Sequence, residues 1–141
     1  MDLEKYQGLW YEISKIPFKW KAVCTRATAY YQYDKIKNTL SIENSCWKNN
    51  EIFGTRKAIG IPVQPFLLKV LFNDGLPNDG WGDYLVEYTD YINYAIVGSP
   101  SKEHLWILAR KMQITAAEYN KLLDIIYCRG YPLYKLKINI I

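Results

Sequence analysis

The side chains that could carry out covalent chemistry in this chain are one histidine, His104, and three cysteines, Cys24, Cys46 and Cys128. A cysteine nucleophile needs a basic neighbour that lowers the pKa of its thiol, so His104 would have to lie beside one of the cysteines. A single histidine excludes multi-histidine metal sites and most catalytic triads. The sequence has no CxxC pair, which argues against a zinc ribbon or a thioredoxin-like site. We therefore expect neither a metal nor a cofactor.

The cysteines also bear on the redox compartment. An odd number of cysteines without a leader favours free thiols in a reducing compartment, although one disulfide with a free thiol stays open. No basic and apolar leader precedes residue 10, and no apolar run reaches the roughly 18 residues of a membrane span. The chain shows no lipid anchor, so we expect a soluble, intracellular protein; whether a leader was removed stays open.

Composition predicts a folded domain with an aromatic core. Half of the 141 residues are hydrophobic and 23% are charged, and the chain contains 13 Tyr and 5 Trp. This length fits one domain over residues 1–141. The net charge of +4 favours anionic ligands weakly, and membrane contact stays open. The lysines are spread along the chain without a run of five basic residues, so we expect no nucleic-acid partner.

Most of the chain is predicted to form short strands, because apolar segments recur between turn residues every 8 to 14 positions. Short turns favour antiparallel neighbours, and eight such strands can close into an up-and-down barrel. The expected strands are 8–16, 27–34, 39–47, 51–60, 66–72, 82–89, 93–98 and 104–110, with a turn over Pro62 to Pro65.

One segment near the end of the chain predicts a helix instead. Thr115 and Glu118 form a capping-box pattern, and an apolar stripe follows until Gly130 and Pro132 end the helix. The strands at 93–98 and 104–110 are apolar on both faces, so we expect the helix to pack against the outside of the barrel. Alternation over residues 134–140 predicts a final short strand. The predicted fold is therefore all-β, an eight-stranded antiparallel barrel with one C-terminal helix.

Three sequence elements carry a family resemblance. They are GxWYE from Gly8, TDYxxYA from Thr89, and Arg110 at the end of the eighth strand. In this order, and in the stretches LEKYQGLWYEI, TDYINYAIV and LWILAR, the chain resembles the lipocalin family, most closely its bacterial outer-membrane and apolipoprotein D group. The resemblance implies a structural role for the motif residues at one end of the barrel, where Arg110 stacks on Trp10. These structural residues are Gly8, Trp10, Asp90, Tyr91 and Arg110.

The two-residue period of strands, combined with the lipocalin resemblance, assigns the residues that face the interior. The lining is apolar and aromatic, which suits an acyl chain or a flat ring. We expect a modest elongated cavity; a fully packed interior is the alternative. The predicted ligand-binding residues are Ala29, Tyr31, Ile42, Asn44, Cys46, Ala58, Leu68, Val70, Phe72, Tyr84, Val86, Tyr88, Ala95, Val97, Trp106 and Leu108.

Two kinds of function stay open. The first is a non-enzymatic carrier of fatty acids, lysophospholipids or similar hydrophobic molecules, acting as a monomer or a homodimer. An anionic lipid would place its headgroup at the end of the barrel opposite Trp10, near Lys19, Lys21, Arg26 or Arg56. The alternative is a lipid-modifying enzyme that uses an inward-facing cysteine, for which Cys46 is the candidate, with Cys24 expected near the end of the barrel opposite Trp10. Cysteine in a strand is more often a small buried apolar residue, so we favour the carrier.

Overall fold

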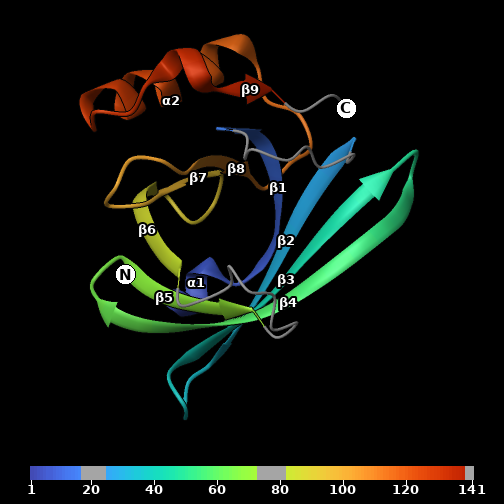
Figure 1. Ribbon diagram of the computed structural model, residues 1–141, viewed down its shortest axis with the longest axis vertical. Helices are drawn as coiled ribbons and strands as arrows, with labels where there is room; N and C mark the ends of the chain where they lie inside the picture. Colours follow the sequence, from blue (N-terminus) through green and yellow to red (C-terminus); the bar gives the residue numbers. More distant parts are fainter. Residues whose placement is uncertain (17–24, 73–81, 139–141) are drawn as a thin grey trace.

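The computed structural model describes residues 1–16, 25–72 and 82–138, and its strands form a closed ring (Figure 1). Each strand pairs antiparallel with the next along the chain, and β1 pairs with both β8 and β2, which closes the ring. The predicted eight-stranded up-and-down barrel is confirmed. The strands are β1 Gly8–Lys15, β2 Arg26–Asp34, β3 Thr39–Lys48, β4 Glu51–Gln64, β5 Leu67–Phe72, β6 Gly82–Thr89, β7 Tyr94–Gly98 and β8 Leu105–Ala109.

The two ends of the barrel differ. Strand β1 begins at the end where Trp10 and Arg110 meet, which we call the closed end, and it runs to the opposite end, which we call the mouth. The β1–β2 pairing extends only from Gly8 opposite Tyr31 to Tyr11 opposite Thr28, so it lies at the closed end. A short helix, α1 (Leu3–Tyr6), precedes β1 at this end, and Leu3 and Tyr6 are buried.

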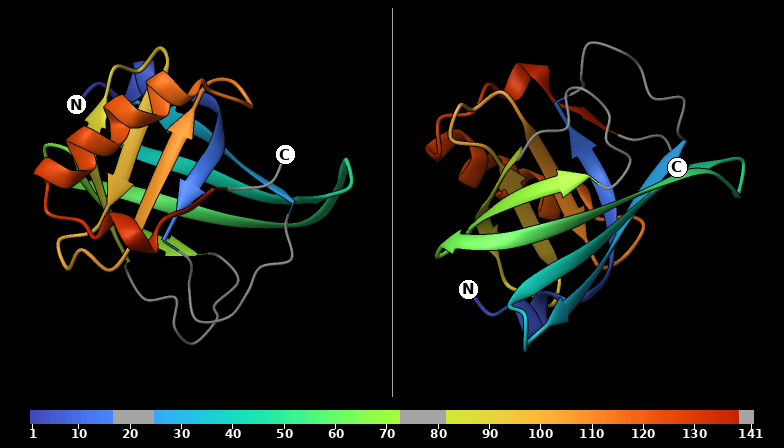
Figure 2. Two further views of the ribbon diagram at one scale, coloured as in Figure 1. Left: turned by 90° about the horizontal axis from the view of Figure 1, so that it is seen from above. Right: turned by 60° about the horizontal axis from the view of Figure 1, so that its bottom comes forward.

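The helix α2 (Ala116–Cys128) covers one outer face of the barrel, over β7, β8 and β1 (Figure 2). The Glu118 backbone NH donates to the Thr115 hydroxyl at 3.1 Å, and the Thr115 NH donates to the Glu118 carboxylate at 2.9 Å. This is the predicted capping box. Leu122 and Ile126 pack on the outer side chains of the strands, which include Ile107. The barrel therefore has two cores, one inside the ring and one under α2.

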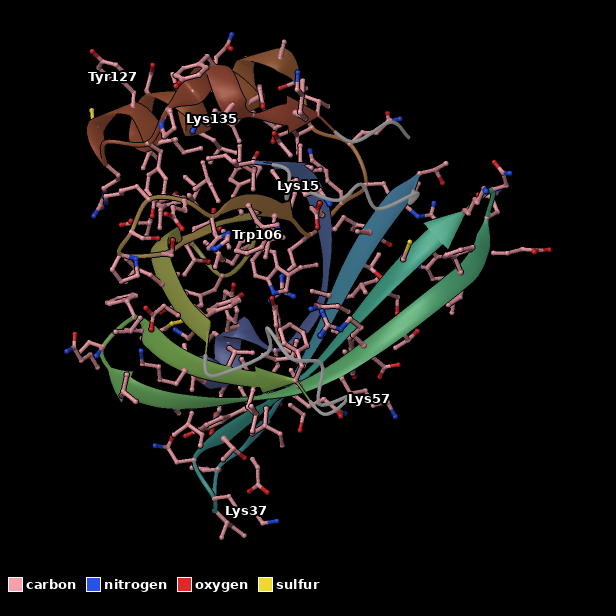
Figure 3. All side chains as sticks on the ribbon, viewed as in Figure 1. Lys15, Lys37, Lys57, Trp106, Tyr127 and Lys135 are labelled. Carbon is pink, nitrogen blue, oxygen red and sulfur yellow. The ribbon has the colours of Figure 1, made fainter. Side chains whose placement is uncertain are left out.

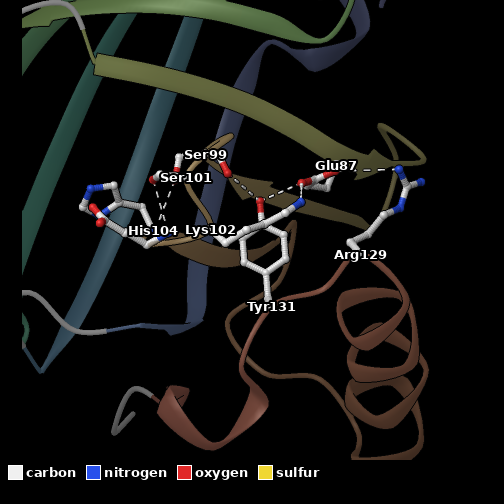
Figure 4. Close-up of polar contacts among 8 residues, drawn as sticks. Glu87, Ser99, Ser101, Lys102, His104, Arg129 and Tyr131 are labelled. Carbon is white, nitrogen blue, oxygen red and sulfur yellow. Dashed lines mark hydrogen bonds and ion pairs between the residues drawn. The ribbon is translucent and has the colours of Figure 1, made fainter.

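A buried carboxylate fixes the end of α2 to the barrel (Figure 4). The Tyr131 hydroxyl donates to Glu87 Oε2 at 2.6 Å and lies 3.2 Å from the carbonyl oxygen of Ser99. Only 7% of the Glu87 side chain is exposed, and Lys102 and Arg129 form ion pairs with it at 3.5 and 3.7 Å. Burial, followed by the hydrogen bond to Glu87, raises the pKa of Tyr131. These groups lie outside the barrel, so we assign them a structural role.

Three elements differ from the sequence prediction. A turn was expected over Pro62 to Pro65, but strand β4 continues through Pro62 to Gln64. It can continue because the β4–β5 register shifts between Pro62 and Gln64. Such a bulge accommodates a residue without a backbone NH. The predicted final short strand is confirmed as β9 (Lys137–Ile138), which pairs with β1. It starts later than expected, because a 3-10 turn occupies Leu133–Lys135. Helix α1 was not predicted; the Asp2 carboxylate caps it by accepting from the Lys5 NH at 3.2 Å.

Candidate functional site

A stacked pair of side chains closes one end of the barrel. The guanidinium carbon of Arg110 lies 3.7 Å from the centroid of the Trp10 ring, and Trp10 is fully buried. The Trp10 indole NH donates to the carbonyl oxygen of Tyr6 at 2.9 Å. Arg110 donates to three carbonyl oxygens, those of Tyr91, Leu9 and Lys5, at 3.0 to 3.1 Å. Each of the three guanidinium nitrogens thus donates one hydrogen bond, and a cation held over an indole face in this way is a rigid closure.

The other predicted motif residues shape the backbone around this pair. Gly8 has a φ of +102°, and a Cβ there would lie 3.2 Å from Arg110 Nη1, so a side chain would be strained and crowded. The Asp90 carboxylate accepts from the backbone NH groups of Asn93 and Tyr94 at 2.8 and 2.9 Å, which orders the β6–β7 turn. That turn holds the Tyr91 carbonyl that accepts from Arg110.

Most of the residues predicted to line the interior lie together inside the ring. The inner core is continuous from Tyr6 and Trp10 at the closed end to residues of all eight strands. Val86 is also buried and pairs with the inward-facing Val97. Asn44 pairs with Ala29 and Arg56 and therefore shares their face. The predicted residues in the inner core are Ala29, Tyr31, Ile42, Ala58, Leu68, Val70, Phe72, Tyr84, Ala95, Val97, Trp106 and Leu108.

Tyr88 was predicted to face the interior, and the structure contradicts this. The β6–β7 register shifts between Val86 and Tyr88, so that Tyr88 pairs with Ile96 rather than with an inward-facing residue. Both side chains belong to the core under α2. A bulge inserts one residue into a strand, so that the side chains after it point to the opposite face of the sheet. A prediction based on strict two-residue alternation does not include this reversal.

Cys46 lies on the face predicted, but it has no thiol, because it is disulfide-bonded. A disulfide sulfur carries no nucleophilic thiolate, so the catalytic alternative that relied on Cys46 fails. The expectation of free thiols throughout the chain is also wrong, and the alternative of one disulfide with a free thiol applies. Cys128 is free and exposed at the end of α2. Cys24, Lys19 and Lys21 lie outside the described residues.

Three tyrosine hydroxyls meet inside the barrel, and we call Tyr6, Tyr31 and Tyr84 the tyrosine triad. The Tyr84 oxygen lies 2.6 Å from that of Tyr6 and 2.7 Å from that of Tyr31. Tyr31 on β2 and Tyr84 on β6 extend from opposite walls, four strands apart around the ring. The Tyr6 and Tyr31 rings stack with centroids 5.1 Å apart, and Tyr6 packs on Trp10. The triad thus spans the interior directly above the closed end.

Burial keeps these phenols protonated. It raises the pKa of Tyr31 to about 12 and raises the pKa values of Tyr6 and Tyr84 well above the ordinary value. Smaller effects come from the neighbouring triad members, from Glu12 on Tyr31 and from Arg110 on Tyr6. All three hydroxyls therefore remain hydrogen-bond donors at neutral pH. Tyr31 and Tyr84 were predicted to face inward, whereas Tyr6 precedes the first expected strand and was missed.

Two charged residues inside the barrel were also missed. Glu12 pairs with the inward-facing Leu108, and Lys15 pairs with the inward-facing Trp106, beyond a register shift in β1. The Lys15 ammonium lies 3.5 Å from the Glu12 carboxylate, and their side chains are 22% and 13% exposed. Strict alternation from the inward-facing Trp10 could have predicted that Glu12 also faces the interior. Lys15 faces inward only because the register of β1 shifts between Glu12 and Ser14.

The inward-facing side chains become more exposed toward the mouth. At the closed end Trp10 and Leu40 are fully buried, and Leu68 is 2% exposed. Toward the mouth Asn44, Arg56, Phe72 and Trp106 retain partial exposure although they point into the ring. Tyr84, which is opposite Leu68 and nearer the closed end, is also partly exposed. Figure 3 shows Trp106 within the ring of strands and Lys57 on the outside of β4. An inward-facing side chain keeps exposed surface only where neighbouring side chains leave space beside it.

Of the cationic residues predicted near the mouth, Arg56 faces the interior and Arg26 does not. The guanidinium of Arg56 lies 4.0 Å from the Phe72 ring centroid on the inner face. Arg26 precedes the inward-facing Ala27 in β2 and lies over the outer Trp47 ring at 4.9 Å. Within the described ranges, no cluster of three metal-ligating side chains is present. None of the helices described is long and apolar enough to cross a membrane.

Comparison with known proteins identifies the family. The model of the lipocalin-like domain matches residues 1–140. A putative lipocalin of Acanthamoeba polyphaga mimivirus is 34% identical over 99% of this chain and 84% of its own length. Apolipoprotein D of Cavia porcellus is 31% identical over 98% of this chain and 76% of its own length. The chain therefore belongs to the lipocalin family, as its three motifs predicted.

Solved structures agree on the fold. Lobster apocrustacyanin A1 superposes with a TM-score of 0.74 over 97% of this chain and 78% of its own, at 15% sequence identity. At that identity the likeness concerns the barrel alone. Lipocalins bind small hydrophobic ligands and are generally not enzymes, and this chain has the closed barrel and apolar interior that such binding uses.

Proposed function

We propose that this protein binds one long apolar molecule, such as a fatty acid or a lysophospholipid, in the interior of its barrel and carries or sequesters it. The observation that supports this most strongly is the partial exposure of Phe72, Tyr84 and Trp106, three aromatic side chains that point into the ring. An eight-stranded barrel with a filled interior would bury them as completely as Trp10. The interior toward the mouth is lined by the surfaces that an acyl chain would cover.

The charges near the mouth suit an anionic headgroup. Arg56 and Lys15 face the interior there, and Arg56 lies flat against Phe72. A carboxylate or phosphate at this level would be near both cations while its acyl chain extended toward the closed end. Glu12 lies 3.5 Å from Lys15 and partly compensates its charge.

A titration with a fluorescent fatty acid tests the proposal. Trp106 should transfer excitation energy to the probe, and we expect saturation at one probe per chain. Asn44→Phe fills partly accessible space on the inner face, whereas Glu43→Phe adds the same side chain to the exposed outer face of the same strand. Asn44→Phe should weaken binding at least tenfold and Glu43→Phe should leave it unchanged. Equal effects of the two variants, or no saturable binding up to tens of micromolar, would contradict the proposal.

A further inference from the structure

Three hydrogen bonds hold the tyrosine triad together as a ring of hydroxyls. The Tyr84 oxygen lies 2.6 Å from that of Tyr6 and 2.7 Å from that of Tyr31, and Tyr6 and Tyr31 share a third hydrogen bond. Each phenol can donate one hydrogen bond and accept another, so the three hydroxyls satisfy one another. This arrangement suits a buried site, where an unpaired hydroxyl would cost free energy. The triad therefore needs no ligand to complete it.

The triad crosses the interior on the mouth side of Trp10. Tyr31 and Tyr84 extend from opposite walls of the ring of strands, and Tyr6 packs on Trp10 with ring centroids 5.3 Å apart. Besides burial, Glu12 contributes to the raised pKa of Tyr31, and Glu12 follows Trp10 by two residues toward the mouth on β1. The three hydroxyls therefore lie between the Trp10 ring and the mouth, where they block the way along the barrel axis.

The side chains on the two sides of the triad differ in exposure. Toward the closed end, Trp10 and Leu40 are fully buried, so protein atoms fill the interior there. Tyr84 itself keeps exposed surface, and so do Phe72 and Trp106 toward the mouth, although all three face the interior. The accessible part of the interior therefore ends at the triad.

The distance from the triad to the mouth limits the length of chain that fits. Ala27 is the first inward-facing residue of β2, and it lies four residues before Tyr31. A strand rises about 3.3 Å per residue, so this segment spans about 13 Å. Strands in such a barrel tilt by about 40°, which leaves about 10 Å along the axis, the length of roughly eight carbons of an extended chain. A fatty acid of about ten carbons with its carboxylate at the mouth would therefore reach the triad.

We propose that the tyrosine triad sets the length of chain that the barrel binds, because the ring of hydroxyls stops the end of the chain before it reaches Trp10. This inference rests on the proposed function and specifies its ligand class, molecules with an apolar chain of about ten carbons below a headgroup at the mouth. A longer chain gains no further affinity, since its additional carbons remain in water outside the mouth. Tyr84 determines the limit, because its exposed surface bounds the accessible space.

The test measures dissociation constants for saturated fatty acids from hexanoate to tetradecanoate, by competition against the fluorescent fatty acid. Each buried CH₂ strengthens binding about fourfold, so affinity should rise steeply up to about ten carbons and then level. Tyr84→Ala removes one ring of the triad and opens space for about four further CH₂ groups. Tyr6 and Tyr31 keep their mutual hydrogen bond in this variant. Tyr88→Ala is the matched control, because Tyr88 lies on the same strand but packs in the core under α2.

We expect the dissociation constants of decanoate and tetradecanoate to agree within about threefold in the wild type and in Tyr88→Ala. In Tyr84→Ala, tetradecanoate should bind at least about tenfold more tightly than decanoate. A wild-type affinity that keeps rising to tetradecanoate overturns the inference and leaves the proposed function intact, and so does an unchanged limit in Tyr84→Ala. Failure of every fatty acid to bind the wild type removes the proposed function itself.

Photolabelling of the wild type with decanoate that carries a diazirine at its chain end needs no variant. Labels on Tyr31 or Tyr84 support the inference, because the end of the chain then stops at the triad. Labels on Trp10 or Leu40 overturn it, because the chain would then have passed the ring of hydroxyls.

Discussion

Replacing Arg110 by methionine should destabilise the barrel strongly. Methionine keeps an apolar stem over the Trp10 indole but removes three hydrogen bonds and the cation–π contact at 3.7 Å. Water can replace part of each lost bond at this end of the barrel, so we count about 0.7 kcal/mol for each of them. The cation–π contact adds about 1 kcal/mol. The free energy of unfolding should therefore fall by about 3 kcal/mol, which corresponds to a decrease of roughly 10 °C in Tm for a domain of this size.

Differential scanning calorimetry measures this decrease, and the adjacent Lys111→Met is the control. Lys111 also loses a positive charge, but its side chain is 60% exposed and its one ion pair, with Glu118, is a surface contact. Its Tm should change by less than about 2 °C. Arg110→Lys should lie between the two, because it keeps the charge but not the fork of donors. Equal Tm values for Arg110→Met and Lys111→Met would refute the structural role of the closed end.

Three further predictions concern other parts of the molecule. Tyr131→Phe removes the charge-assisted hydrogen bond to Glu87 and should lower the free energy of unfolding, measured by urea titration, by about 2 kcal/mol. The affinity for fatty acid should stay unchanged, and a loss of affinity would show that this cluster is coupled to the interior. Thr115→Ala removes the α2 cap and should cost about 1 kcal/mol by the same assay, whereas no change would mean that the capping box contributes nothing. The native state should also hold the triad protons to higher pH than the unfolded chain, because burial raises the pKa values of these phenols. The titration of the triad should then leave stability unchanged below about pH 10 and lower it above that pH by up to about 1.4 kcal/mol per pH unit for each phenol. An equally steep fall in the variant Tyr6→Phe/Tyr31→Phe/Tyr84→Phe would contradict this.

The fold was predictable because its signals are local. Alternating apolar residues mark the strands, and Thr115 with Glu118 marks the start of α2, so neither depends on distant parts of the chain. The errors occur where a single residue breaks the period. The bulge beside Val86 turns Tyr88 toward α2, and the bulge at Pro62 lets β4 continue through an expected turn. Propensity and spacing do not specify where a strand absorbs an extra residue.

The candidate site was predictable only in part, because its polar features are assembled from distant segments. The three motifs indicated the contact between Trp10 and Arg110, since the parity of the strands brings both to one end. The tyrosine triad instead combines a residue of α1 with residues of β2 and β6, and the sequence contains 13 tyrosines without a sign of which three meet. Lys15 reaches the interior only through the register shift in β1.

Photolabelling with a fatty acid that carries a diazirine at the end of its chain tests most directly whether the ligand occupies the barrel interior. The outer face of β4 and β5 offers a competing apolar surface, because Ile61, Val63 and Leu71 are 38 to 50% exposed there. The account predicts one label per chain, mapped by mass spectrometry to peptides that contain Tyr84, Trp106 or other inward-facing residues, and competed by unlabelled fatty acid. Labels confined to the outer side chains of β4 and β5 would contradict it.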